Sequence, residues 1–307
     1  MSALAAGIDV GGSGTKACLV ANTGPSGTTA LRTEMTAANS LGNLVLTALK
    51  RTLTEAGRDL DQVTSIGIGV PGQVNEGIVR HAGNLGIDET GFDLGGYVSS
   101  ATQVATFVEN DMRVAAYGAY IQSVSSHPAM RNLVYVGLGT GVSAGVVING
   151  EVFRGSRGLA GEFGHVPMGT GIACVCGSVG CLETVIGATA LGREWHQTPV
   201  SSLFQAASGG DLQATALAAR AIDHLAEAMW WLAATYDPDL FYIGGGVGAG
   251  APSIRSMVAT RWTEMEGDSE LARRVLDPNR IRMYDLEEPV GAYGAALLGA
   301  DLARSPG

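Results

Sequence analysis

The stretch GLAGEFGHVPMGTGIACVCGSVGCLE, residues 158–183, gathers several residue types that bind metal ions. Cys174, Cys176 and Cys181 follow the spacing C-x-C-x4-C, and His165 precedes the first of them by nine residues. Three thiolates and one imidazole form a complete tetrahedral ligand set for zinc. Because no coordination position is evidently left for water, the sequence predicts a structural zinc site rather than a catalytic one.

Other interpretations of the cysteines fit the spacing less well. Cys174 and Cys176 are too close for an easy disulfide, and a redox pair usually has the spacing C-x-x-C. Buried core cysteines do not usually cluster among glycines. Gly177 and Gly180 instead suit a tight loop that turns between the last two thiolates.

The composition indicates a globular protein with a sizeable core. The chain has 307 residues, of which 46% are hydrophobic and 16% are charged, so two domains are possible. The net charge of −10 argues against nucleic acid or an anionic membrane as the main partner, because both bind basic surfaces. No apolar run is long enough to span a bilayer, and no secretory signal is evident. We therefore expect a cytoplasmic, reducing location, in which thiolates stay free.

Two glycine-rich turns each separate a pair of strand patterns. DVGGSGTK at 9–16 lies between apolar runs at 4–10 and 17–21, and GLGTGVSAG at 137–145 joins strands expected at 132–138 and 143–148. Neither matches a Walker loop or a dinucleotide fingerprint. Each alone is consistent with an ordinary hairpin, but backbone N–H groups of such turns can also receive phosphate oxygens. Their repetition suggests two related halves that face a common phosphate.

A possible catalytic carboxylate follows a further strand pattern. A strand is expected at 104–108 and a helix at 112–123, with Glu109, Asn110 and Asp111 between them. A carboxylate at the C-terminal end of a strand in an α/β sheet can act as a base, although Asp111 can equally cap the helix. Further helices are expected at 40–56, 189–196, 212–235, 257–266 and 290–303, and further strands at 66–70, 240–243 and 280–284.

In this order, the motifs closely resemble those of the ROK family, which comprises bacterial sugar kinases and related repressors. The resemblance covers essentially the whole chain and is most specific at 158–183. It implies an α/β fold of the actin/hexokinase-like (ribonuclease H-like) class, with two domains and a central cleft. The smaller domain would comprise 1–112 and 290–307, and the larger domain 113–289 with the zinc loop.

The resemblance also implies residue roles for an ATP-dependent hexokinase or glucokinase. Asp111 would be the general base, and His165 would serve both the zinc and the sugar. Mg2+ would accompany ATP near Asp9. The sugar contacts would be Asn84, Asn110, Asp111, Glu162, His165 and Glu183; the nucleotide contacts would be Asp9, Gly11, Gly12, Ser13, Thr15, Lys16, Gly139, Thr140, Gly141, Gly244, Gly245 and Gly246; the zinc ligands would be His165, Cys174, Cys176 and Cys181.

Departures from the family pattern leave the identity of the sugar substrate undetermined. Many family kinases read N-D-A-N where this chain reads N-D-M-R, so Arg113 replaces an asparagine, and Ala119 replaces a glutamate. A tryptophan common after the NL pair is missing from NLGIDETGF. Glucose, another hexose or an amino-hexose is therefore expected, with transfer to the 6-hydroxyl.

The longer turn GGSGTK resembles the corresponding turn of polyphosphate-dependent glucokinases. Those enzymes generally lack the zinc cysteines, so ATP remains the first choice of phosphate donor and polyphosphate the alternative.

Further alternatives to a kinase are a sugar-binding pseudokinase and a regulator. The family's repressors carry a DNA-binding segment before the first phosphate motif, and here only eight residues precede Asp9. A homodimer or homotetramer is expected from the family.

Overall fold

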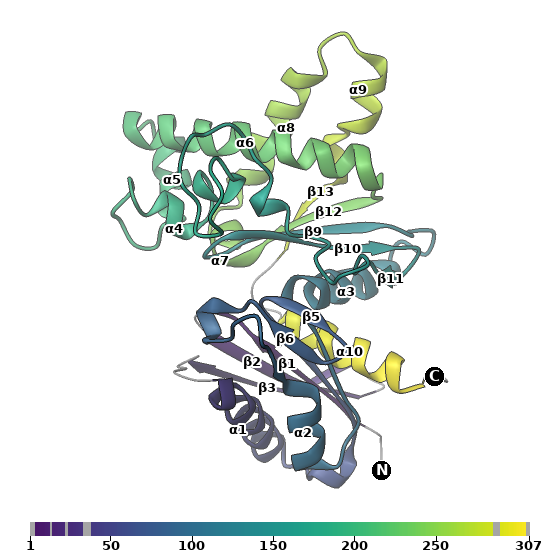
Figure 1. The fold of residues 1–307 in the computed structure, drawn as a ribbon. Coiled ribbons are helices and arrows are strands. Elements are labelled where there is room, and N and C mark those ends of the chain that lie inside the picture. Colours follow the sequence, from purple (N-terminus) through teal and green to yellow (C-terminus); the bar gives the residue numbers. More distant parts are fainter. Residues whose placement is uncertain (1–3, 13, 22–23, 33–37, 285–288, 305–307) are drawn as a thin grey trace. The chain divides into compact units, whose positions relative to one another are not determined.

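The computed structural model describes residues 4–12, 14–21, 24–32, 38–284 and 289–304 (Figure 1). The chain divides into two compact units. The first comprises Met1–Pro128, Val152–Leu159 and Glu288–Gly307, and the second comprises Ala129–Glu151 and Ala160–Glu287. Among the described residues, no helix is both long enough and apolar enough to cross a membrane.

The first unit is built on a five-stranded sheet of order β3-β2-β1-β4-β8. Strands β1 to β3 are antiparallel, whereas β1, β4 and β8 run parallel. The strands are β1 (Leu4–Val10), β2 (Gly14–Ala21), β3 (Gly24–Arg32), β4 (Val63–Val70) and β8 (Thr106–Asn110), and a smaller sheet contains β5 (Gln73–Asn75), β6 (Ile78–Arg80) and β7 (Phe92–Asp93). The helices are α1 (Ala38–Ala56), α2 (Leu94–Thr102), α3 (Asp111–Val124) and α10 (Val290–Arg304).

Side chains of β1 alternate between the two faces of this sheet. Ile8 and Val10 belong to the core that contains α1 and α2, whereas Ala5 packs with α10 on the opposite face (Figure 1). Helix α10 lies very close to the sheet, since a Cβ on Gly7 would be 1.9 Å from the carbonyl oxygen of Ala292. Helix α10 therefore belongs to the first unit, although it follows the second unit in the chain.

The second unit has a five-stranded sheet of order β11-β10-β9-β12-β13. As in the first unit, an antiparallel hairpin is followed by parallel strands. The strands are β9 (Leu133–Leu138), β10 (Val142–Ile148), β11 (Glu151–Val152), β12 (Leu240–Gly244) and β13 (Ile281–Met283). The helices are α4 (Ala188–Leu191), α5 (Ser202–Ser208), α6 (Leu212–Tyr236), α7 (Gly245–Ala249), α8 (Ser253–Glu266) and α9 (Glu270–Val275).

Buried aromatic residues join the second sheet to its long helices. Trp262 of α8 is fully buried, packs edge-on against Phe241 of β12, and donates a hydrogen bond of 3.0 Å to the carbonyl oxygen of Ala226 in α6. Trp230 and Trp231, also in α6, have exposed fractions of 37% and 64%. Trp231 therefore lies on the solvent-facing side of α6.

Several elements differ from the sequence-based expectation. Strand β3 and helices α2, α5 and α9 were not expected, and the short helix expected at 189–196 already ends at Leu191. Helix α2 contains two glycines, so it depends on its Asp93 cap and on the burial of Leu94 and Val98. The boundary expected after residue 112 also differs, because α3 packs against α10 and the first unit extends to Pro128.

Candidate active site

The four predicted zinc ligands lie together in the second unit. Their donor atoms, from His165, Cys174, Cys176 and Cys181, all lie within 4.8 Å of one another. The Nδ1 atom of His165 is 3.6 Å from the Sγ atom of Cys174, and the Sγ atoms of Cys176 and Cys181 are 3.7 Å apart. A tetrahedral zinc would separate a nitrogen and a sulfur by about 3.6 Å and two sulfurs by about 3.8 Å. The chemistry and the spacing of the donors therefore fit a structural zinc ion.

The loop that carries the cysteines is a narrow hairpin. The N–H of Met168 donates to the carbonyl oxygen of Gly180 at 2.7 Å, and the N–H of Cys174 donates to that of Ser178 at 2.9 Å. Gly177 and Gly180 have φ values of 88° and 87°, in the left-handed region that favours glycine. These two glycines allow the tight turn that the sequence predicted between the last two thiolates.

The proposed sugar ligands Glu162 and His165 lie at a short 3-10 turn, Phe163–His165. The Nδ1 side of the imidazole faces the cysteines, whereas Nε2 is 4.0 Å from a carboxylate oxygen of Glu162. One ring nitrogen can therefore bind the metal while the other points toward a residue expected to contact sugar. Gly161 lets this loop lie against β10, because a Cβ there would be 1.9 Å from the carbonyl oxygen of Ala144.

Glu183 joins the zinc loop to the second glycine-rich turn. Its Oε2 atom accepts a hydrogen bond of 3.1 Å from the N–H of Val142, and a Cβ on Gly141 would be only 2.0 Å from that oxygen. The turn is closed by a hydrogen bond of 3.0 Å from the N–H of Gly139 to the carbonyl oxygen of Gly141, and the carbonyl oxygen of Thr140 accepts from α4. The expected phosphate-binding turn and an expected sugar ligand are thus in direct contact.

In the first unit, two carboxylates flank a glycine at the ends of parallel strands. Asp9 of β1 pairs in register with Gly69 of β4, and a Cβ on Gly69 would be 3.3 Å from Asp9 Oδ1 and 3.6 Å from the Cα of Asp111. The pKa of Asp9 is raised to about 7, chiefly by burial and also by the charge of Asp111, whereas the charge of Lys16 opposes the shift. A nearby cation would relieve this repulsion, so Asp9 and Asp111 fit the neighbourhood of a bound Mg2+.

Asn110 caps helix α3. Its Oδ1 atom accepts hydrogen bonds from the N–H groups of Met112 and Arg113, and its Nδ2 atom donates to the carbonyl oxygen of Gly72 at 3.2 Å. The sequence had assigned a possible capping role to Asp111, but the cap is Asn110, and Asp111 is the first residue of the helix. The carboxylate of Asp111 also accepts a hydrogen bond of 2.9 Å from the N–H of Met112, but Asn110 supplies the cap.

The first glycine-rich turn lies next to Asn84. The Nδ2 atom of Asn84 would be 3.3 Å from a Cβ on Gly12, and the N–H of Gly11 donates to the carbonyl oxygen of Gly14 at 2.9 Å. Thr15 is only 1% exposed, whereas Lys16 is exposed. Ser13, also expected to contact phosphate, lies outside the described residues.

The three glycines 244–246 do not form a simple turn, because Gly244 ends β12 and Gly245 begins α7. Gly244 and Gly245 pack tightly, since a Cβ on Gly244 would be 2.0 Å from the hydroxyl of Tyr135 and one on Gly245 would be 2.5 Å from the carbonyl oxygen of Leu138. Helix α7 begins at Gly245, and Gly246 is exposed with open space beside it. Gly246 is therefore the best placed of the three to lie against a flat ligand.

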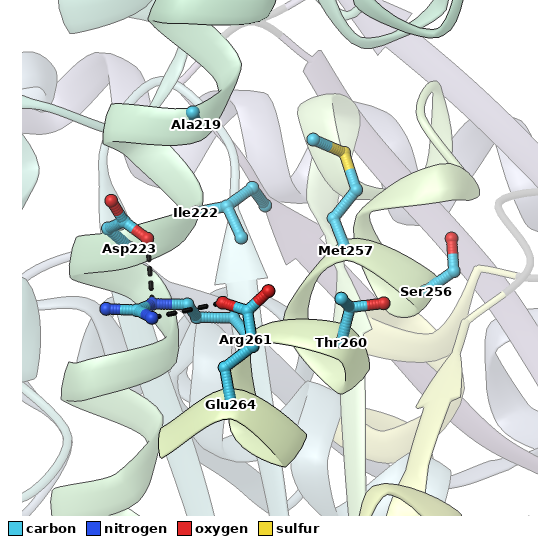
Figure 2. A pocket seen from close by; sticks show the side chains of 8 residues that line it. All are labelled: Ala219, Ile222, Asp223, Ser256, Met257, Thr260, Arg261 and Glu264. Carbon is cyan, nitrogen blue, oxygen red and sulfur yellow. Dashed lines mark hydrogen bonds and ion pairs between the residues drawn. The ribbon is translucent and has the colours of Figure 1, made fainter.

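A shallow pocket elsewhere in the second unit lies between α6 and α8 (Figure 2). Arg261 is paired there with Asp223 at 2.8 Å and with Glu264 at 3.1 Å. None of the residues that the sequence assigns to the site lines this pocket, and its guanidinium is already paired with two carboxylates. We assign it no role in catalysis.

Comparison with known proteins identifies the family. The family model described as "ROK family" matches residues 5–301. This chain belongs to the ROK family. The family match accounts for the mixed α/β architecture of the two units, which is that of the actin/hexokinase-like fold.

Individual relatives of this ROK protein are sugar kinases by name. A glucokinase from Halalkalibacterium halodurans is 29% identical over 279 residues, which covers 82% of this chain and 80% of the relative. An N-acetylmannosamine kinase from Yersinia pestis is 32% identical over 178 residues, 56% of this chain and 60% of the relative. The fold is also similar to that of a solved ROK family glucokinase from Streptomyces griseus in complex with glucose and AMPPNP, with a TM-score of 0.78 and 25% sequence identity. The matched region covers 97% of this chain and 99% of the solved chain.

The raised pKa of Asp9 leads to a prediction about the stability of this ROK protein. Because the folded-state pKa of about 7 lies above the ordinary value of 3.8, folding favours the protonated carboxyl. The associated stability is present below pH 4 and is lost as the pH rises through 7. In buffer without divalent cations, we expect the isosteric change Asp9→Asn to raise the free energy of unfolding by about 1–3 kcal/mol at pH 8, and by much less at pH 5.

Thermal unfolding at the two pH values measures this effect. Asp61→Asn is the matched control, because Asp61 is exposed and its replacement should leave both melting temperatures within a degree or so of wild type. Equal effects of Asp9→Asn at pH 5 and pH 8 would contradict the titration of Asp9 in this range.

Proposed function

We propose that this protein is a kinase that transfers the γ-phosphate of ATP to the 6-hydroxyl of glucose or of a related hexose or amino-hexose. The observation that carries the proposal is the placement of Asp111 at the end of β8, beside Asp9, in a chain that matches the ROK family from residue 5 to residue 301. The similarity to named glucokinases and N-acetylmannosamine kinases supports a sugar as the acceptor.

Asp111 is the proposed general base. It would accept the proton of the attacking sugar hydroxyl, while neighbouring groups hold that hydroxyl in line with the phosphate. The Mg2+ that accompanies ATP would neutralise charge on the transferred phosphoryl group, and Asp9 would hold it, directly or through water. The turns at Gly11–Gly12 and Gly139–Gly141 would receive phosphate oxygens through N–H groups other than those of Gly11 and Gly139, which donate hydrogen bonds within the turns.

The proposed sugar contacts are Asn84, Asn110, Glu162, His165 and Glu183. Carboxylates and imidazole nitrogens can pair with several hydroxyls at once, which suits a hexose. The structural zinc would hold His165 and, through the same loop, Glu183 in fixed positions, so its contribution is rigidity rather than chemistry. Asn110 has less capacity than the others, because its Oδ1 atom already caps α3.

A coupled ADP-release assay with Mg-ATP tests the proposal. The acceptors would be glucose, mannose, fructose, N-acetylglucosamine, N-acetylmannosamine and 3-amino-3-deoxyglucose. We expect saturable turnover on at least one of them. Turnover with polyphosphate in place of ATP would keep the acceptor and change the donor, whereas sugar binding by calorimetry without turnover on either donor would indicate a pseudokinase or regulator and contradict the proposal.

A further inference from the structure

We propose that Arg113 is a positioning residue for Asp111, and that it acts through the buried carboxylate of Glu109. This inference rests on the proposed role of Asp111 as the general base. Arg113 lies two residues after Asp111, in the first turn of α3, and is only 1% exposed. A fully buried arginine is rare unless it is paired, and this one is paired beside the proposed base.

The first step is the contact between Arg113 and Glu109. The Nε atom of Arg113 donates to Oε1 of Glu109 at 2.7 Å, and the two side chains are 1% and 7% exposed. The same Oε1 atom accepts a hydrogen bond of 2.8 Å from the N–H of Asn110. The guanidinium of Arg113 therefore fixes the carboxylate of Glu109. That carboxylate in turn holds the N–H of Asn110, the residue immediately before Asp111.

The second step is the contact of the same pair with the segment 152–159. This segment precedes the proposed sugar ligands Glu162 and His165 in the chain. The Nη1 atom of Arg113 donates to the carbonyl oxygen of Gly158 at 3.1 Å, and the Nε atom of Arg154 is bonded to Oε2 of Glu109. Gln73 adds a hydrogen bond of 2.6 Å to the carbonyl oxygen of Arg157. Gly158 has a φ of 68° and lies against the carbonyl oxygen of Val74, so the segment has little room to shift.

The third step distinguishes the positioning role of Arg113 from a contribution to the stability of the fold. Among the described residues, the buried Nη2 atom of Arg113 has no hydrogen-bond partner, which costs free energy. Buried ion pairs are also poor sources of stability compared with apolar side chains of similar volume. The forked geometry of arginine instead suits the joining of two fixed points, here the Glu109 carboxylate and the Gly158 carbonyl. Arg113 thus links the backbone at Asp111 to the segment that leads into Glu162 and His165.

The test compares Arg113→Met and Arg113→Lys with the control Arg51→Met. Arg51 also forms an i,i+4 pair, with Glu55, but it is 53% exposed and remote from these contacts. For Arg113→Met we expect a fall in kcat of about 10- to 100-fold, with little change in the KM for ATP, because a small displacement of a catalytic group has effects of this size. Lysine, which keeps the charge but reaches only one of the two points, should recover part of the loss.

Hydrogen exchange provides a readout that does not depend on turnover. In Arg113→Met we expect faster exchange at the amide of Asn110 and in 153–159, and unchanged exchange in β1 and β4. A folded Arg113→Met enzyme with wild-type kcat and wild-type exchange would overturn the inference. If the methionine variant does not fold, the same criteria apply to Arg113→Lys.

Wild type and Asp111→Asn are assayed in parallel so that two kinds of failure are distinguished. A wild-type protein without turnover on any acceptor or donor would overturn the proposed function and this inference together. An active wild type, an inactive Asp111→Asn and an unaffected Arg113→Met would overturn the positioning role alone.

Discussion

Replacement of Asp111 by asparagine is expected to lower kcat for sugar phosphorylation by about 10²- to 10⁴-fold, the usual contribution of a general base. Asparagine keeps the size of the side chain but cannot accept the hydroxyl proton. The fold should persist, because Asn110 supplies the cap of α3. The measurements are ADP release on the preferred sugar and thermal unfolding of the same preparation.

The same substitution has an electrostatic consequence that serves as an internal check. The charge of Asp111 is one of the causes that raise the pKa of Asp9, so Asp111→Asn should lower that pKa and weaken the loss of stability between pH 5 and pH 8. Asp61→Asn, with an exposed carboxylate, should change neither the activity nor the pH dependence. A folded Asp111→Asn protein with full turnover would rule out Asp111 as the base.

Local chemistry explains which parts of the site the sequence could predict. The proposed zinc ligands and the turns at Gly177 and Gly180 lie within one short stretch, so spacing alone restricts their geometry. The place of Asp111 between a strand and a helix was predictable, because the patterns of β8 and α3 lie directly on either side of it. The α10 helix was predictable from its length and its small residues.

Long-range contacts explain what the sequence could not predict. Glu109 meets Arg154, 45 residues away in the chain, and no local pattern marks either residue as a partner. Similarly, the contact of Glu183 with the N–H of Val142 depends on how the zinc loop packs against β10. The sequence marks Arg113 only as a departure from the family pattern, whereas its contacts with Glu109 and Gly158 are evident only in the three-dimensional structure.

These contacts suggest how sugar and phosphate binding could be coupled within the second unit. Glu183 follows Cys181 by two residues, and its carboxylate also holds the N–H of Val142 next to the turn at Gly139–Gly141. A disturbance of the proposed metal site should therefore reach both the proposed sugar ligands and the proposed phosphate-binding turn. Of the two, the sugar ligands should respond more strongly, because His165 is itself a proposed metal ligand.

Loss of the zinc is accordingly the second large effect that we expect. Purified protein should contain one zinc ion per chain, and Cys181→Ser should remove it, because Cys181 is a buried member of the cluster. Structural zinc contributes directly to folding free energy, so the melting temperature should fall by more than ~5 °C. The KM for sugar should rise at least ~10-fold, as expected when the support of a binding residue is removed.

The control separates metal loss from the loss of a buried thiol. Cys18 is buried in the first unit, whereas the cluster lies in the second, and Cys18→Ala should retain zinc and leave the KM for sugar unchanged. Metal content by mass spectrometry, thermal unfolding with and without a chelator, and separate KM values for sugar and ATP provide the readouts. The loop that carries the cysteines also carries His165 and Glu183. A zinc-free protein with an unaltered KM for sugar would therefore show that these side chains hold their positions without the metal. The proposed purpose of the zinc would then be wrong.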